Sequence, residues 1–244
     1  MYSYYWLFFL LILACAVFAS SASAKVTRTF RALNDASTRS KMTGYDTATR
    51  LLRANGVQDI AVGRVRGELT DHYHPTKGVV NLSESVYGND SLAAVAVAAH
   101  EIGHVMQKKK GYLPYKLRQI LVPVTNIGSR LALPLVLVGL LLDLFVQLTA
   151  YKNLGYYLAL AGVASYGLAT IFALVTLPVE FNASRRAKRM LLKEGVLTEE
   201  EMPFAEKMLS AAAMTYVASL VTSLVYFLRF LLWVFLLFGG RKRR

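Results

Sequence analysis

The chain has 244 residues, of which 55% are hydrophobic, and a formal net charge of +13. This apolar content is too high for an ordinary soluble domain and predicts several membrane helices. In such a chain, basic residues are typical of the loops beside membrane helices. Because no polar segment interleaves them with aromatic residues, we predict no nucleic-acid partner. Cys15 is the single cysteine, which excludes an intrachain disulfide and a metal site built from several thiolates.

The N-terminal segment is apolar and uncharged. Residues 4–19 form an aromatic-rich run that extends to residue 24, close to the length of a membrane span. Ala22-Ser23-Ala24 resembles a signal-peptidase site, but the positively charged start of a signal peptide is missing. We therefore expect residues 1–24 to form an uncleaved membrane anchor.

From residue 25 the composition becomes that of a soluble domain. Residues 43–54 predict a short helix, because their apolar side chains fall on one face and Gly56 follows the end. Residues 60–65 and 79–83 predict two short strands, one on each side of a polar stretch at 71–75. We therefore expect a small α+β portion.

Residues 93–104 carry a His-Glu-x-x-His pattern in a helix otherwise built from small apolar residues. His100 and His104 are four residues apart, so both imidazoles project from one helix face and can bind one zinc ion. Zinc lowers the pKa of a bound water towards 7, and the neighbouring Glu101 could take its proton. The alternative is three chance polar residues on a helix surface, which the spacing and the apolar setting argue against. Asp90 and Ser91 are both candidate N-caps of this helix.

The second half of the chain contains three long apolar stretches. Residues 131–150 and 154–178 are each near the ~20 residues needed to cross a bilayer and predict a transmembrane hairpin joined at residues 151–153. The amphipathic residues 112–130 before it are expected to lie along the bilayer surface. The last stretch, residues 211–238, is also long enough to span.

A catalytic zinc site needs a third protein ligand, and Glu180 is our choice. A two-helix hairpin returns the chain to the side from which it entered, so Glu180 would leave the membrane beside His100 and His104. Two alternatives stay open: Glu180 pairs with Arg185 or Arg186, or a later glutamate is the ligand. The later candidates are Glu194, Glu199, Glu200, Glu201 and Glu206.

The sequence resembles the bacterial membrane neutral zinc metallopeptidases, the YugP-like group, which is distantly related to the gluzincin proteases. The resemblance implies that His100, His104 and Glu180 are the zinc ligands and that Glu101 is the catalytic base. We expect one zinc ion per chain. The stretches that carry the resemblance are residues 69–75, 80–83, 93–104, 117–118, 176–186 and 211–218.

Three further side chains are candidates for stabilising the transition state. His72 and Tyr73 precede the motif and Tyr216 follows it, and each could donate a hydrogen bond to a developing oxyanion. The alternative, which we favour, is that residues 72–74 form a turn that packs on the motif helix. Tyr216 would then be an aromatic residue at the membrane interface.

The predicted fold is a mainly α membrane protein with a small α+β, zincin-like catalytic portion and about four apolar membrane segments. We divide the chain by composition. The predicted domains are an anchor (1–24), the catalytic portion (25–118), an amphipathic segment with the hairpin (119–178), a helical segment carrying the third ligand (179–210), and a last membrane segment with a basic tail (211–244).

The basic residues near the predicted site set the orientation. Lys25, Arg28, Lys116 and the Lys108–Lys110 run lie on the same side as the site, so the positive-inside rule places that side in the cytoplasm of a bacterial-type cell membrane. The basic cluster at residues 241–244 would lie opposite if the last apolar stretch spans once.

We predict an integral-membrane zinc metallopeptidase, an endopeptidase acting on protein or peptide substrates, with membrane protein processing or quality control as its role. The strand at residues 79–83 would be an exposed edge that pairs with an extended substrate. A zinc hydrolase of lipids or small amides is a third class. The alternative is a non-catalytic zinc-containing membrane scaffold or chaperone-like protein, but a structural site has no use for Glu101. The substrate and the oligomeric state stay open.

Overall fold

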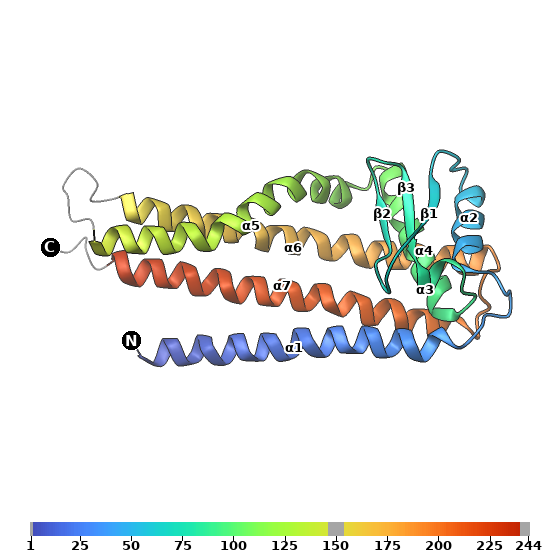
Figure 1. Cartoon of the computed structure of the whole chain (residues 1–244), viewed down its shortest axis with the longest axis horizontal. Coiled ribbons are helices and arrows are strands. Elements are labelled where there is room, and N and C mark those ends of the chain that lie inside the picture. The colour runs from blue at the N-terminus through green and yellow to red at the C-terminus, as the bar shows by residue number, and fades with distance from the viewer. Residues whose placement is uncertain (1, 146–153, 240–244) are drawn as a thin grey trace. The chain divides into compact units, whose positions relative to one another are not determined.

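The computed structural model describes residues 2–145 and 154–239, which form mainly helices and one three-stranded sheet (Figure 1). The chain divides into two compact units. The helical unit comprises Met1–Ala19, Leu117–Leu177 and Val217–Arg244, and the mixed unit comprises Ser20–Lys116 and Pro178–Tyr216. The elements in chain order are α1 (Tyr2–Asn34), α2 (Gly44–Ala54), β1 (Ala61–Val65), β2 (His72–His74), β3 (Val79–Ser83), α3 (Glu84–Tyr87), α4 (Leu92–Lys109), α5 (Leu113–Phe145), α6 (Leu154–Lys193) and α7 (Met202–Gly239).

Three helices of the described chain are long and apolar enough to cross a membrane. They are α1, α6 and α7, which contain the predicted anchor, the second arm of the hairpin and the last apolar stretch. In α5, Leu113–Gly128 and Leu133–Gly139 pass the same test only as a pair, and they are bent by 42°. Pro134 lies at this bend, where its ring interferes with the helical hydrogen bonding of the preceding turn. Four membrane segments therefore stay a prediction.

The two arms of the predicted hairpin lie close together within the helical unit. A Cβ atom added to Gly139 of α5 would lie 2.6 Å from main-chain atoms of Gly155 and Ala159 in α6. Small residues allow such backbone contact between membrane helices. The predicted link at residues 151–153 lies outside the described residues.

The sheet of the mixed unit has the order β1-β3-β2. β1 pairs with β3 in parallel, with Ala61 opposite Val79, and β2 pairs with β3 antiparallel, with His72 opposite Asn81. The two predicted strands are confirmed, within one residue of their predicted bounds. The expectation that residues 79–83 form an exposed edge is wrong, because β3 is the central strand and the edges are β1 and β2.

Helix α4 lies in the core of the mixed unit, against α2, β2 and β3. Its first turns, including Ala93, Ala94 and Ala96, are fully buried, because small side chains let neighbouring elements approach from every direction. Ser91 is the N-cap and accepts a hydrogen bond from the amide of Ala94 at 3.1 Å, whereas Asp90 accepts one from the Ser37 hydroxyl.

The second arm of the hairpin and the polar segment after it form one helix, α6, which continues through Pro178. Membrane-protein helices tolerate proline where neighbouring groups satisfy the freed carbonyl. The predicted domain limits near residues 24, 118, 178 and 210 also fall inside continuous helices. They mark changes of composition, and the division into five domains stays a prediction.

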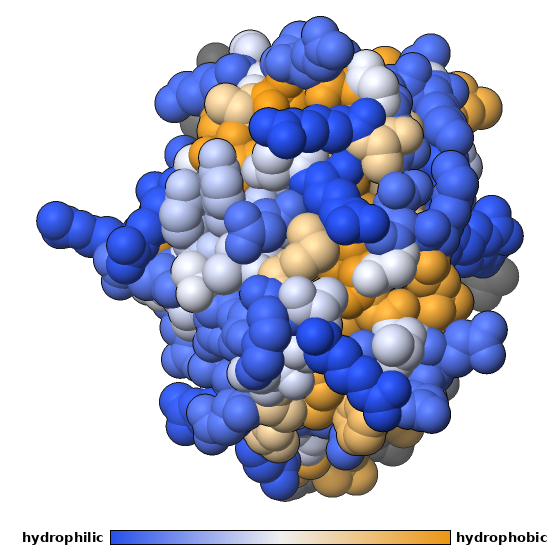
Figure 2. Space-filling model, turned by 90° about the vertical axis from the view of Figure 1, so that its right-hand side faces the viewer, coloured by the Kyte–Doolittle hydropathy of each residue, from blue (hydrophilic) through white to orange (hydrophobic). Residues whose placement is uncertain are grey.

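One face of the structure, which carries α2, is covered largely by hydrophilic side chains, with smaller apolar areas between them (Figure 2). Such a surface is typical of a protein part that is exposed to water.

Candidate metal centre

Three predicted ligands converge in the mixed unit. His100 and His104 from α4 and Glu180 from α6 each offer one ligand atom, and these atoms lie within 4.8 Å of one another. Glu180 Oε2 is 3.2 Å from His100 Nε2 and 3.5 Å from His104 Nε2. The two imidazole rings are nearly perpendicular, at 89°, and the Nε2 atoms of both lie near the same Glu180 oxygen. The Glu180 side chain is 1% exposed.

Gln107 determines the tautomer of His104. The Gln107 amide nitrogen donates to the Val179 carbonyl at 2.7 Å, and a carbonyl can only accept. The amide oxygen of Gln107 must therefore face His104 Nδ1, 3.0 Å away, so Nδ1 carries the hydrogen. In the neutral ring, Nε2 then presents a lone pair to the Glu180 carboxylate.

The donor set fits a zinc ion. Two acceptors, His104 Nε2 and Glu180 Oε2, face each other in a buried position, and this is favourable only when a proton or a metal cation lies between them. Two imidazole nitrogens and one carboxylate oxygen are a known ligand set of catalytic zinc, which leaves a coordination position open.

Glu101 lies beside this cluster and is 7% exposed. Burial raises the pKa of Glu101 to about 7; the charge of His100 lowers it, the carboxylates of Glu180 and Asp71 raise it, and a backbone hydrogen bond from Tyr73 lowers it. A carboxyl group with a pKa near neutrality can both accept and donate a proton at physiological pH.

The candidate stabilisers lie in three different settings. His72 is exposed; its Nδ1 donates to the Thr70 carbonyl at 2.8 Å and its Nε2 accepts from the Asn81 amide at 3.0 Å. Tyr73 is buried in the core, and its hydroxyl has no hydrogen-bond partner among the described residues. Tyr216 is half-buried on α7. Their roles stay predictions.

Three polar residues around the centre had no predicted role. Gln107 holds His104, Asn182 Oδ1 accepts from Gln107 at 3.1 Å, and the Ser184 hydroxyl lies 3.2 Å from His100 Nδ1. The position of Gln107, three residues after His104, was a usable signal, because residues i and i+3 are neighbours on a helix surface. For Asn182 and Ser184, the signal was their closeness in sequence to Glu180.

Most of the later glutamates make other contacts. Glu206 lies 2.8 Å from Lys188, Glu194 lies 3.7 Å from Lys193, Glu200 pairs with Arg39, and Glu201 accepts from the main chain of Thr198 at 2.9 Å. These contacts support Glu180 as the third ligand.

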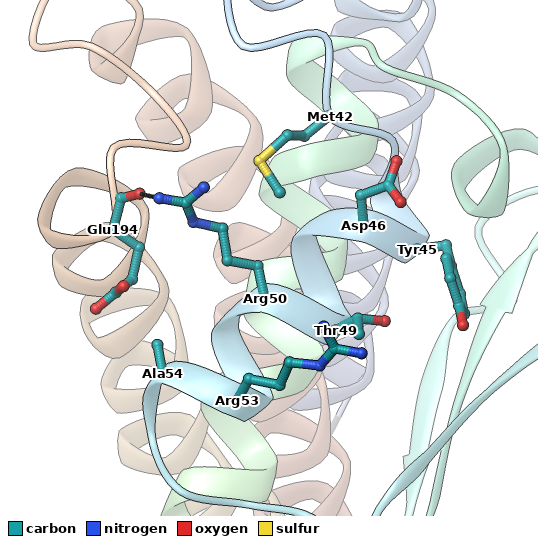
Figure 3. A pocket seen from close by; sticks show the side chains of 8 residues that line it. All are labelled: Met42, Tyr45, Asp46, Thr49, Arg50, Arg53, Ala54 and Glu194. Atoms are coloured by element: carbon teal, nitrogen blue, oxygen red, sulfur yellow. Dashed lines mark hydrogen bonds between the residues drawn. The ribbon is translucent and has the colours of Figure 1, made fainter.

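A separate surface hollow of about 630 Å³ lies over α2 (Figure 3). Arg50 extends across it and donates a hydrogen bond to the Glu194 carbonyl at 2.5 Å. Of the residues considered for the site, the hollow contains Glu194 alone, one of the alternative third ligands. It is lined by Met42, Tyr45, Asp46, Thr49, Arg50, Arg53, Ala54 and Glu194.

Comparisons with known proteins agree with the chemistry of this centre. A family model described as "Putative neutral zinc metallopeptidase" matches residues 8–235. The chain is 41% identical over 226 residues to the "Putative membrane protease YugP" of Bacillus subtilis (strain 168), an overlap of 93% of this chain and 96% of that protein. No solved structure matches the chain.

Proposed function

Because the chain belongs to the neutral zinc metallopeptidase family, as its sequence predicted, we propose that it is a membrane peptidase with its catalytic centre at His100, Glu101, His104 and Glu180. The observation that carries the proposal is the convergence of the three ligand atoms within 4.8 Å, from two helices that are far apart in sequence.

His100, His104 and Glu180 would hold one zinc ion per chain. When bound, zinc polarises a peptide carbonyl and makes a water more acidic. Ser184 and Gln107 lie on the Nδ1 side of the two imidazoles, which leaves both Nε2 atoms directed at Glu180. The ligand geometry is thus held before any substrate arrives.

Glu101 would act as general base and then as general acid. Its carboxylate takes a proton from the attacking water and later passes that proton to the amine that leaves. This exchange needs a group with a pKa close to the working pH, and burial raises the pKa of Glu101 to about 7. A structural zinc site would not need such a residue, so the scaffold alternative is not favoured.

The outer edge of β2 would bind the substrate main chain. β2 is an edge strand, and the hydrogen bond from the backbone amide of Tyr73 to Glu101 places this edge beside the centre. A peptide in extended conformation could add to this edge by main-chain hydrogen bonds and lie across the centre. This role replaces the one first expected for β3.

The peptidase would lie in the cell membrane, with the mixed unit in the cytoplasm. Its helices α1, α6 and α7 are long and apolar enough to span, and the basic residues near the site follow the positive-inside rule. A Lys77→Cys variant in a Cys15→Ser background tests the orientation. Residue 77 is exposed, and an impermeant maleimide should label it only after the cells are opened; labelling in intact cells would place the site outside.

The test of the activity uses the full chain in detergent. The protein should hold one zinc ion and cleave peptides, lose cleavage when a chelator removes the metal, and regain it when zinc is returned. Cleavage that survives complete metal removal would exclude a zinc peptidase. Full zinc loading without cleavage of any protein or peptide would favour the scaffold, and cleavage of lipid or small amides alone would favour the third class.

A further inference from the structure

Gln107 is fully buried, and each polar atom of its side-chain amide has a partner. The oxygen accepts from His104 in the same helix, α4. The nitrogen donates to the Val179 carbonyl and to Asn182 Oδ1 in α6, at 2.7 and 3.1 Å. The Gln107 side chain therefore contacts one predicted zinc ligand, His104, and two residues within two positions of another, Glu180.

A second contact also determines the orientation of this amide. Arg186 donates from Nε to Asn182 Oδ1 at 2.8 Å, and an arginine side chain can only donate. Asn182 therefore presents its oxygen to Gln107, and Gln107 must present its nitrogen in return. The Arg186 guanidinium lies 6.0 Å from the ring centroid of Tyr112. The main-chain amide of Tyr112 donates to the main-chain carbonyl of Gln107.

We propose that Gln107 is a positioning residue for the zinc site, because it holds His104 as the Nδ1–H tautomer and ties α4 to α6, so that ligands from both helices converge. The inference rests on the proposed function, since it assumes that His104 and Glu180 bind the metal. The inference adds how the chain orients His104 and holds α4 against α6. In known zinc sites, loss of the group that orients a ligand typically costs about 10–100-fold in metal affinity.

The test compares three variants of the full chain in detergent by competition with a chromophoric zinc chelator. Gln107→Met keeps the length of the side chain but removes both hydrogen-bonding functions, and should weaken zinc binding about 10–100-fold. Gln107→Glu keeps an acceptor for His104 Nδ1 but loses the donor to Val179 and Asn182, so it should keep the tautomer and still lose zinc affinity. Val95→Ala shortens another fully buried residue of α4; it should lower the melting temperature and leave zinc affinity unchanged.

Nitrogen-15 NMR of histidine-labelled, zinc-free protein gives a readout that a merely structural role would not change. His104 should be protonated at Nδ1 in the wild type and in Gln107→Glu, and should exchange between tautomers in Gln107→Met. Wild-type zinc affinity with an unchanged tautomer in Gln107→Met would overturn the proposal. So would exchange between tautomers in Gln107→Glu, because that variant keeps the acceptor for His104 Nδ1.

The proposed function can fail separately. If the wild type binds no zinc, or if His104→Ala binds it as well as the wild type, the ligand assignment is wrong. In contrast, zinc binding that depends on His104 but not on Gln107 would overturn only the positioning role.

Discussion

Gly103 and Ala183 bring the two ligand-bearing helices into backbone contact. A Cβ atom added to Gly103 of α4 would lie 2.5 Å from the carbonyl oxygen of Ala183 in α6, closer than real Cβ contacts allow. Glycine in a helix interior costs about 0.5–1 kcal/mol relative to alanine. That cost is offset here, because the missing side chain lets the helix with His100 and His104 approach the helix with Glu180.

We expect Gly103→Ala to destabilise the protein, although alanine is the better helix former. Overpacking typically costs about 1–3 kcal/mol, which exceeds the gain in helix propensity. Zinc affinity should fall as well, because α6 must move away from α4. Thermal unfolding with and without zinc measures both effects. Gly88→Ala is the matched control, since an added Cβ meets no atom within 4 Å there, and should behave like the wild type.

Changing His100 or His104 to alanine should abolish both zinc binding and peptidase activity. Two remaining ligands are too few to hold a catalytic metal. Metal analysis of the purified variants checks this, with His72→Ala and His74→Ala as controls, because these imidazoles belong to β2 and not to the cluster. Full zinc stoichiometry in folded His104→Ala protein would refute the assignment of that ligand.

Glu101→Gln should retain zinc and lose activity. The amide occupies the same space but cannot accept a proton from water, and the loss of a general base typically costs about 10²–10⁴-fold in rate. Zinc content and peptide turnover are measured on the same sample. Turnover at the wild-type rate would show that another group acts as the base. The same variant should retain bound substrates, so the proteins that it captures would identify the substrate class.

Local sequence patterns predicted the parts of the site that lie within one element. The four-residue spacing of His100 and His104 placed both on one face of α4, and alternation and turn residues located β1 and β3. Residues 72–74 form the strand β2 and not the turn that the sequence favoured. Three residues are too few for a periodic pattern, and the strand is held by pairing with β3.

Contacts between distant segments could not be predicted in the same way. Gln107 is polar and lies in α4 directly before the basic residues Lys108 and Lys109, so its own residue type predicts a surface position. Its burial depends on Val179, 72 residues further along the chain. Likewise, the predicted membrane span ended at Pro178, whereas α6 continues through that residue. At Gln107, tertiary contacts outweighed the local preference.

Glu180→Ala should weaken zinc binding as severely as either histidine variant. Glu180 lies on α6, 80 residues from His100, and its carboxylate is directed at the Nε2 atoms of both histidines. The substitution removes one of three ligands and leaves the two imidazoles without an anionic partner in a buried position. Zinc titration of the detergent-solubilised variant measures the loss.

Glu199→Ala and Glu200→Ala are the controls for this prediction. Both residues lie in the polar connection between α6 and α7, and Glu200 already pairs with Arg39, so zinc binding should be unaffected. Glu180→Gln adds a second control, because it preserves the volume of the side chain and removes its charge. If Glu180→Ala bound zinc normally while Glu199→Ala lost it, the third ligand would lie in that connection. The packing of α4 against α6 around Gly103 would then have a purely structural purpose.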